Sequence, residues 1–166
     1  MADPMQSRGV ALRPMRWWDV ERLLPVERDL FGRSAWSAET FWSELAHPDT
    51  RWYVVAALTA DPERVIGYAG LLAPGPEADV QTIAVAPQVQ GRGVGGVLID
   101  ALIAQAGQRS ADSLLLEVRA DNEPAIALYR KRGFERIAVR PRYYQPEDVD
   151  AWVMRLRPVG DRLSTP

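Results

Sequence analysis

The alternation of hydrophobic and polar positions along the chain predicts seven strands and four helices. Strands are expected where β-branched and aromatic residues concentrate between turn signals. They are Val10–Arg13, Trp52–Leu58, Val65–Leu72, Val80–Val85, Leu114–Val118, Phe134–Arg140 and Ala151–Leu156. Helices are expected where apolar residues recur three or four positions apart. They are Trp17–Phe31 with an interruption or restart near Pro25, a segment through Leu45 that Ser37 caps, Val97–Gln108, and a segment from Asp121 or Asn122 to about Arg132.

The order of these elements is strand, helices, three strands, helix, strand, helix and two strands. This order predicts a mixed α/β domain built around one sheet. The length of 166 residues is typical of a single domain. We therefore expect one domain over residues 10–157, with flexible tails at 1–9 and 158–166, since both ends are rich in small and polar residues.

The composition of the chain limits the kinds of functional site and partner that it can have. The chain has no cysteine and one histidine, His47, which excludes disulfides and thiol nucleophiles and argues against a metal site or a Ser–His–Asp triad. The formal net charge of −2 argues against a strongly basic nucleic-acid binder. No apolar run approaches the roughly 20 residues that a membrane-spanning helix needs, and no secretory signal is visible. We expect a cytoplasmic protein without a metal, a membrane partner or a nucleic-acid partner.

A glycine-rich turn separates a predicted strand from a predicted helix. Four glycines lie within Gly91–Gly96. Free N–H groups at the start of the helix would favour an anion such as a diphosphate, and Arg92 could add a charge-assisted bond. A P-loop is excluded because the segment continues Val97-Leu98 instead of Lys-Ser/Thr. A dinucleotide fingerprint fits formally, but no acidic residue ends the next strand at the expected distance.

The motif Gln90-Gly91-Arg92-Gly93-Val94-Gly95 resembles the coenzyme-binding turn of the GNAT N-acetyltransferases. The segments Leu116–Arg119, Asn122 and Ala127–Phe134 also resemble that superfamily. Trp36-Ser37 and Arg142-Tyr143-Tyr144 narrow the resemblance to the ribosomal-protein-alanine N-acetyltransferases, the RimI branch. The resemblance covers about residues 10–156 and implies a central, mostly antiparallel, twisted sheet with helices on both faces.

The resemblance also implies acetyl-CoA as co-substrate and a protein N-terminal α-amine, of a ribosomal protein, as acceptor. It assigns coenzyme binding to Ile83, Ala84, Val85, Gln90, Gly91, Arg92, Gly93, Val94, Gly95, Gly96, Asn122 and Tyr129. It makes Glu117 the general base and Tyr129 the general acid. Pro141 departs from the family pattern just before the tyrosine pair, where another basic residue is common.

The residues themselves are compatible with this chemistry. An α-amine has a pKa of about 8, so a single carboxylate is an adequate base near neutral pH. Glu117 is the one carboxylate in an apolar strand, although a salt bridge with Arg119 on the same face is an alternative role. Tyr129 would donate its proton uphill by roughly 2 kcal/mol, unless its pKa is lowered or it only hydrogen-bonds the leaving sulfur.

Acceptor recognition rests on aromatic residues. Trp36, Tyr143 and Tyr144 could line a peptide slot, although packing in the core is an equal alternative for Trp36. Tyr143 and Tyr144 are adjacent in a strand, so they should face opposite sides and only one should line the site. Acetylation of a lysine or a small-molecule amine is the main alternative activity. A non-catalytic acyl-CoA-binding domain is a further alternative.

Overall fold

The computed structural model describes residues 9–159, so most of the predicted tails, 1–8 and 160–166, lie outside the described residues. Contacts divide the chain into two compact units. The first unit runs to Leu72 and includes Gln81–Leu102, and the second comprises Ala73–Val80 and the chain from Ile103 onward. The prediction of one domain over residues 10–157 stays a prediction.

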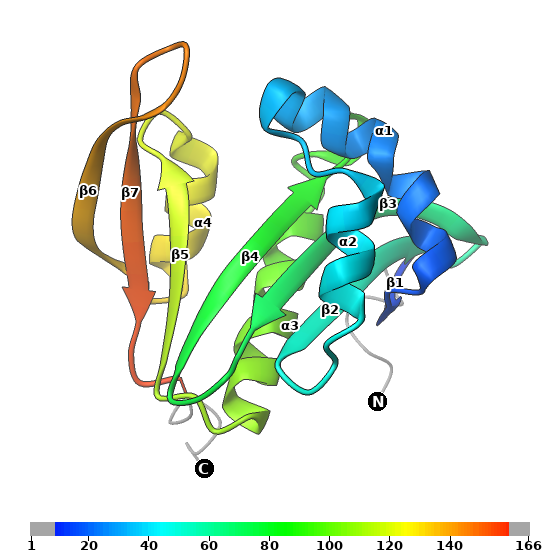
Figure 1. The fold of residues 1–166 in the computed structure, drawn as a ribbon, viewed down its shortest axis with the longest axis horizontal. Coiled ribbons are helices and arrows are strands. Elements are labelled where there is room, and N and C mark those ends of the chain that lie inside the picture. The colour runs from blue at the N-terminus through cyan, green and yellow to red at the C-terminus, as the bar shows by residue number, and fades with distance from the viewer. Residues whose placement is uncertain (1–8, 160–166) are drawn as a thin grey trace. The chain divides into compact units, whose positions relative to one another are not determined.

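The strands form one sheet in the order β1-β2-β3-β4-β5-β7-β6 (Figure 1). Their bounds are β1 Val10–Pro14, β2 Arg51–Leu58, β3 Asp61–Leu72, β4 Glu77–Val85, β5 Ser113–Arg119, β6 Glu135–Tyr144 and β7 Val149–Leu156. β1 and β3 flank β2 in antiparallel pairs, and β5 and β6 flank β7 in the same way. β4 and β5 run parallel. The predicted mixed α/β fold with a mostly antiparallel, seven-stranded sheet is confirmed.

Four α-helices accompany the sheet within residues 9–159. They are α1 Val20–Phe31, α2 Ala38–Leu45, α3 Val94–Gln108 and α4 Glu123–Lys131. The predicted cap of α2 is present, because the Ser37 hydroxyl accepts a hydrogen bond of 3.3 Å from the Thr40 N–H. The expected interruption at Pro25 is wrong. α1 runs through Pro25 without a break. The φ angle that the proline ring imposes is compatible with a helix, and the helix is packed against the core by buried residues before and after Pro25, Val20 and Glu27.

Helices cover both faces of the first unit's strands. The Tyr68 side chain of β3 is fully buried, and its ring lies 5.8 Å from that of Phe41 in α2. The preceding residue, Gly67, faces the other side, where an added Cβ would come within 3.2 Å of Leu98 in α3. Figure 1 shows the same arrangement, with α1 and α2 in front of β2 and β3 and α3 behind.

In the second unit, β5 has one buried and one accessible face. Leu114, Leu116 and Val118 are buried, whereas Glu117 between them is exposed. α4 buries Ile126 and Tyr129, and the Tyr129 ring lies 5.8 Å from that of Phe134. The period-two pattern of β5 therefore gives a packed hydrophobic face and an accessible face that carries polar side chains.

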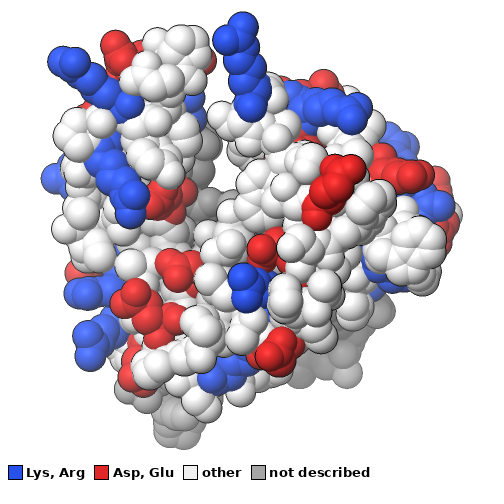
Figure 2. All heavy atoms as spheres, viewed as in Figure 1, with Lys and Arg blue, Asp and Glu red and all other residues white. Residues whose placement is uncertain are grey.

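Charged side chains of both signs are interspersed on the face drawn in Figure 2. Within residues 9–159, no helix is long and apolar enough to cross a bilayer.

Candidate active site

The glycine-rich turn lies in the first unit, between β4 and α3. Gly91 and Gly93 have φ values of +77° and +86°, the left-handed region that glycine adopts without strain. The Gln90 side chain donates a hydrogen bond of 3.2 Å to the Val85 carbonyl and so closes the turn. α3 begins at Val94, three residues before the predicted start, because Gly95 and Gly96 are helical. The turn proper is therefore Gln90–Gly93.

This turn has the properties of an anion site. Gly91 would leave open space around an added Cβ, so a ligand can approach its backbone closely. α3 is 15 residues long, and the N–H groups of its first turn point out of its N-terminus. Beside the turn is a cavity of about 90 Å³. It is lined mainly by apolar side chains: Val10, Leu58, Ile66, Val89, Arg92, Gly93, Val94 and Val97.

The strand before the turn, Ile83–Val85, is the other part of the predicted coenzyme site. The parallel ladder between β4 and β5 has three residue pairs, from Glu77 with Ser113 to Asp79 with Leu115. Ile83–Val85 lies four to six residues beyond the last of these pairs. This early end of the ladder is compatible with a free backbone N–H that could polarise a carbonyl.

Glu117 lies on the accessible face of β5, and its side chain is 32% exposed. The Arg140 Nε of β6 lies 3.1 Å from its Oε1. The alternative expectation of a salt bridge with Arg119 is wrong. Arg119 instead binds both carboxylate oxygens of Asp121, at 3.0 and 3.1 Å, because Asp121 lies just beyond the end of the strand. Glu117 therefore presents a carboxylate with one oxygen held by a guanidinium.

Tyr129 is 5% exposed, and no hydrogen bond from its hydroxyl is found within residues 9–159. Burial, and then the neighbouring Tyr144, raise its pKa to about 12. The lowered pKa that would suit a general acid is therefore absent. Full proton transfer to a thiolate would be uphill by about 5 kcal/mol, so a protonated hydroxyl that donates a hydrogen bond is the better role.

Tyr143 and Tyr144 do not face opposite sides, contrary to the expectation from strand alternation. Their ring centroids lie 5.2 Å apart in an edge-to-face arrangement. The register of β6 is irregular between Arg140 and Tyr144, where Arg142 has a φ of +53°. This irregularity breaks the alternation of side chains and brings both rings to one place.

Tyr144 is within electrostatic reach of both proposed catalytic residues. Burial raises its pKa, and so do the charges of Glu117 and Tyr143. Tyr144 in turn raises the pKa of Tyr129. Tyr144 is therefore coupled by charge to both Glu117 and Tyr129, and its ring contacts that of Tyr143.

Asn122 also lies in the second unit. Its side-chain oxygen accepts a hydrogen bond of 3.3 Å from the Ala125 N–H, so Asn122, not Asp121, caps α4. The cap fixes the direction of the side chain and uses only its oxygen. The amide nitrogen remains as a donor that a ligand could use.

Trp36 lies in the first unit, after α1. Its ring centroid is 5.2 Å from that of Phe41, and the side chain is only partly buried. Its backbone N–H donates a hydrogen bond to Glu27, a buried carboxyl that also accepts a bond of 2.9 Å from the Tyr68 hydroxyl. Burial raises the pKa of Glu27, and the two hydrogen bonds oppose that rise. Glu27 was not predicted from the sequence, although a carboxyl on the buried face of α1 is a signal of such a site.

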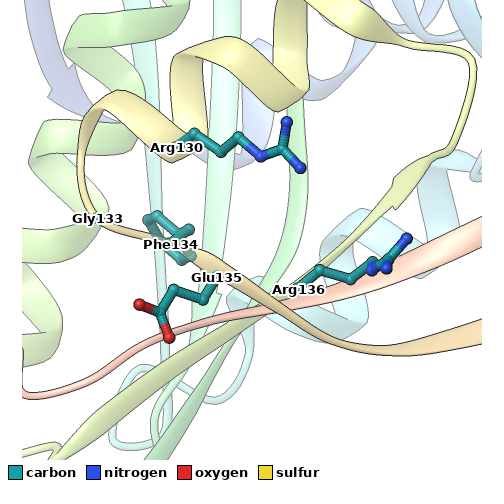
Figure 3. A pocket seen from close by; sticks show the side chains of 5 residues that line it. All are labelled: Arg130, Gly133, Phe134, Glu135 and Arg136. Atoms are coloured by element: carbon teal, nitrogen blue, oxygen red, sulfur yellow. The ribbon is translucent and has the colours of Figure 1, made fainter.

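A separate surface pocket of the second unit contains none of the predicted site residues. It has a volume of about 520 Å³ and is lined by Arg130, Gly133, Phe134, Glu135 and Arg136 (Figure 3). Figure 3 shows that the two arginine side chains extend to the same side, whereas Glu135 turns away. Both guanidiniums lie over the ring of Trp152, at 5.2 and 4.7 Å. The position of the two arginine side chains is therefore explained by cation–π contacts with the half-buried ring of Trp152.

Comparisons with known proteins identify the family. The family described as "Acetyltransferase (GNAT) family" matches residues 15–134. The chain belongs to this GNAT family of acetyltransferases. GNAT acetyltransferases use acetyl-CoA. The match includes the glycine turn, Glu117 and Tyr129.

Named relatives place this GNAT chain near RimI. It is 39% identical to the N-alpha-acetyltransferase RimI of Mycobacterium tuberculosis, over 86% of the chain and 89% of the relative. The crystal structure of the ribosomal-protein-S18-alanine N-acetyltransferase from Escherichia coli superposes with a TM-score of 0.79 at 29% identity, covering 91% and 94% of the two chains. The chain is a RimI-like N-acetyltransferase.

One relative is much longer than this GNAT chain. An uncharacterized protein of Mycobacterium leprae is 46% identical over 142 residues, which are 82% of the chain. The chain spans 38% of the length of that relative.

Proposed function

We propose that this chain transfers the acetyl group of acetyl-CoA to the N-terminal α-amine of a protein, with Glu117 as the general base. The observation that carries the proposal is the exposure of the Glu117 side chain and its contact with Arg140. It is the one carboxylate in Leu114–Val118, it lies on the accessible face, and Arg140 holds one of its oxygens. No bond to the other oxygen, Oε2, is found within residues 9–159, so this oxygen can accept a proton.

The coenzyme would be held by residues whose geometry suits a diphosphate and an extended arm. Bound acetyl-CoA supplies a thioester acyl group and a thiol leaving group. Gly91 and Gly93 allow close approach to the backbone, and the N-terminus of α3 favours negative charge. Arg92 adds a positive side chain at the turn. The amide nitrogen of Asn122 and the backbone of Ile83–Val85 would contact the arm and the thioester carbonyl.

The acceptor ammonium loses two protons in the reaction, one through Glu117 to solvent and one to the departing thiol. Oε2 of Glu117 takes a proton from the acceptor ammonium, directly or through one water, which leaves a neutral amine able to attack. A nitrogen–carbon bond forms and the carbon–sulfur bond breaks. The second proton of the attacking amine passes, directly or through water, to the departing sulfur, so the products are the amide and the free thiol. The Tyr129 hydroxyl donates a hydrogen bond to the departing sulfur, which its raised pKa allows across the working pH range. The proton on Glu117 then returns to solvent.

The acceptor is proposed from the relatives and the aromatic residues together. The names of the relatives specify α-amine acetylation and the alanine of a ribosomal protein. Trp36 of the first unit supplies a partly buried ring, and Tyr143 and Tyr144 of the second unit supply a pair of rings. Each is proposed on its own as a contact for the peptide backbone of the acceptor. A ribosomal-protein acceptor would place the reaction in the cytoplasm.

The test uses two peptides of the same sequence with acetyl-CoA and purified protein. One begins with a free alanine, and the other has a blocked N-terminus and an internal lysine. Mass spectrometry then locates the acetyl group. We expect acetylation of the free α-amine only. Acetylation of the lysine alone would reject the α-amine assignment, and coenzyme binding with neither product would favour a small-molecule amine or a non-catalytic domain.

A further inference from the structure

Glu27 is a buried carboxyl of α1 that takes no part in the reaction proposed above. Its side chain is 2% exposed, and no ion pair of this carboxyl is found within residues 9–159. A buried carboxyl is costly unless hydrogen bonds compensate it. Two donors do so, the Tyr68 hydroxyl of β3 at 2.9 Å and the backbone N–H of Trp36. Glu27 therefore connects β3 to the segment that follows α1.

The chain reverses after α1 and so brings Trp36 back to Glu27. Gly32 has a φ of +51°, which glycine adopts without strain, and a short 3-10 helix, Gly32–Ser34, follows the reversal. Immediately after Trp36, the Ser37 side chain caps α2. The backbone of Trp36 is thus fixed on one side by the bond to Glu27 and on the other by the start of α2.

The indole ring of Trp36 is held by the same group of residues. It lies 5.2 Å from the ring of Phe41, which lies 5.8 Å from the ring of Tyr68. The Tyr68 hydroxyl bonds Glu27, which closes the network. Phe41 and Tyr68 are fully buried, whereas Trp36 is only partly buried. Within this network of four, Trp36 is the member whose ring a ligand can reach.

We propose that Glu27 is a positioning residue for the acceptor, which holds the Trp36 backbone and so keeps the indole ring in the orientation that contacts the peptide. The inference rests on the proposed role of Trp36 as an acceptor contact. A ring that is already ordered binds a peptide more tightly than one that must be ordered on binding. None of the contacts of Glu27 involves Glu117 or Tyr129, so its loss should weaken acceptor binding and leave the chemical step unchanged.

The test measures kcat and KM for the free-alanine peptide in Glu27→Met. This substitution keeps a long side chain and a good helix former but removes both acceptor oxygens. We expect KM for the peptide to rise by roughly three- to tenfold, as expected when a side chain must be ordered on binding. We expect kcat and the affinity for acetyl-CoA to stay within about twofold of the wild type. An unchanged KM would overturn the proposal.

Tyr68→Phe is the matched control. It removes the other hydrogen bond of the same carboxyl, but it keeps the ring that packs on Phe41 and the bond between Glu27 and the Trp36 N–H. We expect KM for the peptide to remain at its wild-type value. An equal rise of KM in Tyr68→Phe and Glu27→Met would show a general loosening of the core and would overturn the proposal.

A double-mutant cycle tests whether Glu27 acts through Trp36. We expect Trp36→Ala to raise KM for the peptide, and we expect Glu27→Met to cause no further rise when it is added to Trp36→Ala. Independent effects that multiply would show that Glu27 affects acceptor binding by another route, and would reject the proposal.

Failure of this inference can be separated from failure of the proposed function. A wild type that does not acetylate the free-alanine peptide rejects both. If Trp36→Ala raises KM and Glu27→Met does not, only the role of Glu27 is rejected. Should Glu27→Met fail to fold, amide hydrogen exchange in the wild type decides. The Trp36 N–H must be protected by at least roughly tenfold before the peptide is added. Protection that appears only with bound peptide rejects the proposal.

Discussion

Arg140 binds Glu117 across an intervening strand, with 3.1 Å between the Arg140 Nε and the Glu117 Oε1. Both side chains are partly exposed, at 56% and 32%, so the pair contributes about 0–1 kcal/mol to stability. Its importance is geometric, since the guanidinium holds one carboxylate oxygen of Glu117. The pair should therefore affect the orientation of the proposed base more than it affects folding.

Replacing Arg140 with glutamine should lower kcat/KM across the pH profile by roughly threefold or more. Without the guanidinium at Oε1, the Glu117 carboxylate is no longer held in one orientation for the acceptor amine. Urea unfolding should show a loss of less than about 1 kcal/mol. Arg142→Gln is the control, because no ion pair of its side chain is found in the described part of the chain. Identical profiles in the two variants would contradict this role of Arg140.

Tyr129→Phe should reduce kcat by roughly ten- to a hundredfold, because the departing sulfur loses its hydrogen-bond donor. Stability should change by less than about 1 kcal/mol, since no bond of the hydroxyl is found within residues 9–159. Acetyl-CoA affinity, measured by calorimetry, serves as the control and should stay nearly constant.

The dependence of kcat on pH in the wild type tests whether the Tyr129 hydroxyl stays protonated. Because the pKa of Tyr129 is raised to about 12, its hydroxyl stays protonated throughout the working range. The kcat profile should therefore show no decline attributable to Tyr129 below about pH 10. A decline near pH 8–9 that disappears in Tyr129→Phe would instead reveal a true acid of lowered pKa.

Gly93→Ala should weaken acetyl-CoA binding by roughly tenfold. Gly93 has a φ of +86°, where a residue with a Cβ is strained by about 1–2 kcal/mol, and relief of that strain would reshape the turn. Gly75→Ala is the matched control, because Gly75 has no left-handed φ and open space around its Cβ position. Unchanged coenzyme affinity in Gly93→Ala would argue against this turn as the coenzyme site.

The first unit contains a buried ion cluster whose effect on stability depends on pH. Asp19 is fully buried, and Arg13 binds both of its carboxylate oxygens at 2.6 and 2.8 Å. Burial alone would raise the pKa of Asp19, but hydrogen bonds from Arg13 and Arg16 lower it well below its ordinary value. A lowered folded-state pKa means that this stabilisation is complete above about pH 4 and is lost as the pH falls further.

Asp19→Asn should therefore lose roughly 3 kcal/mol in the free energy of unfolding at pH 7. The loss should shrink as the pH falls below about 4, because the wild type then loses the same interaction. Urea unfolding across this range measures both effects. Asp61→Asn, which changes an exposed residue at the start of β3, should behave like the wild type. Equal pH dependence in Asp19→Asn and the wild type would reject this explanation.

The sequence predicted the elements well because they depend on local patterns. Periodicity placed all seven strands, and the Ser37 and Asn122 caps are hydrogen bonds that span three residues. The partner of Glu117 could not be predicted locally, because it depends on β7 lying between β5 and β6. The contact of Tyr143 with Tyr144 depends on a left-handed φ at Arg142, a conformation that arginine does not signal.

The most direct test of the central claim is the rate of α-amine acetylation by Glu117→Gln. The substitution keeps the size and polarity of the side chain but removes its ability to take a proton. With the free-alanine peptide, we expect kcat/KM to fall by roughly a hundredfold or more while acetyl-CoA affinity stays within about twofold. Glu147→Gln, an exposed residue outside the proposed machinery, should keep wild-type activity. A Glu117→Gln enzyme that acetylates the peptide within about threefold of the wild-type rate would contradict the account.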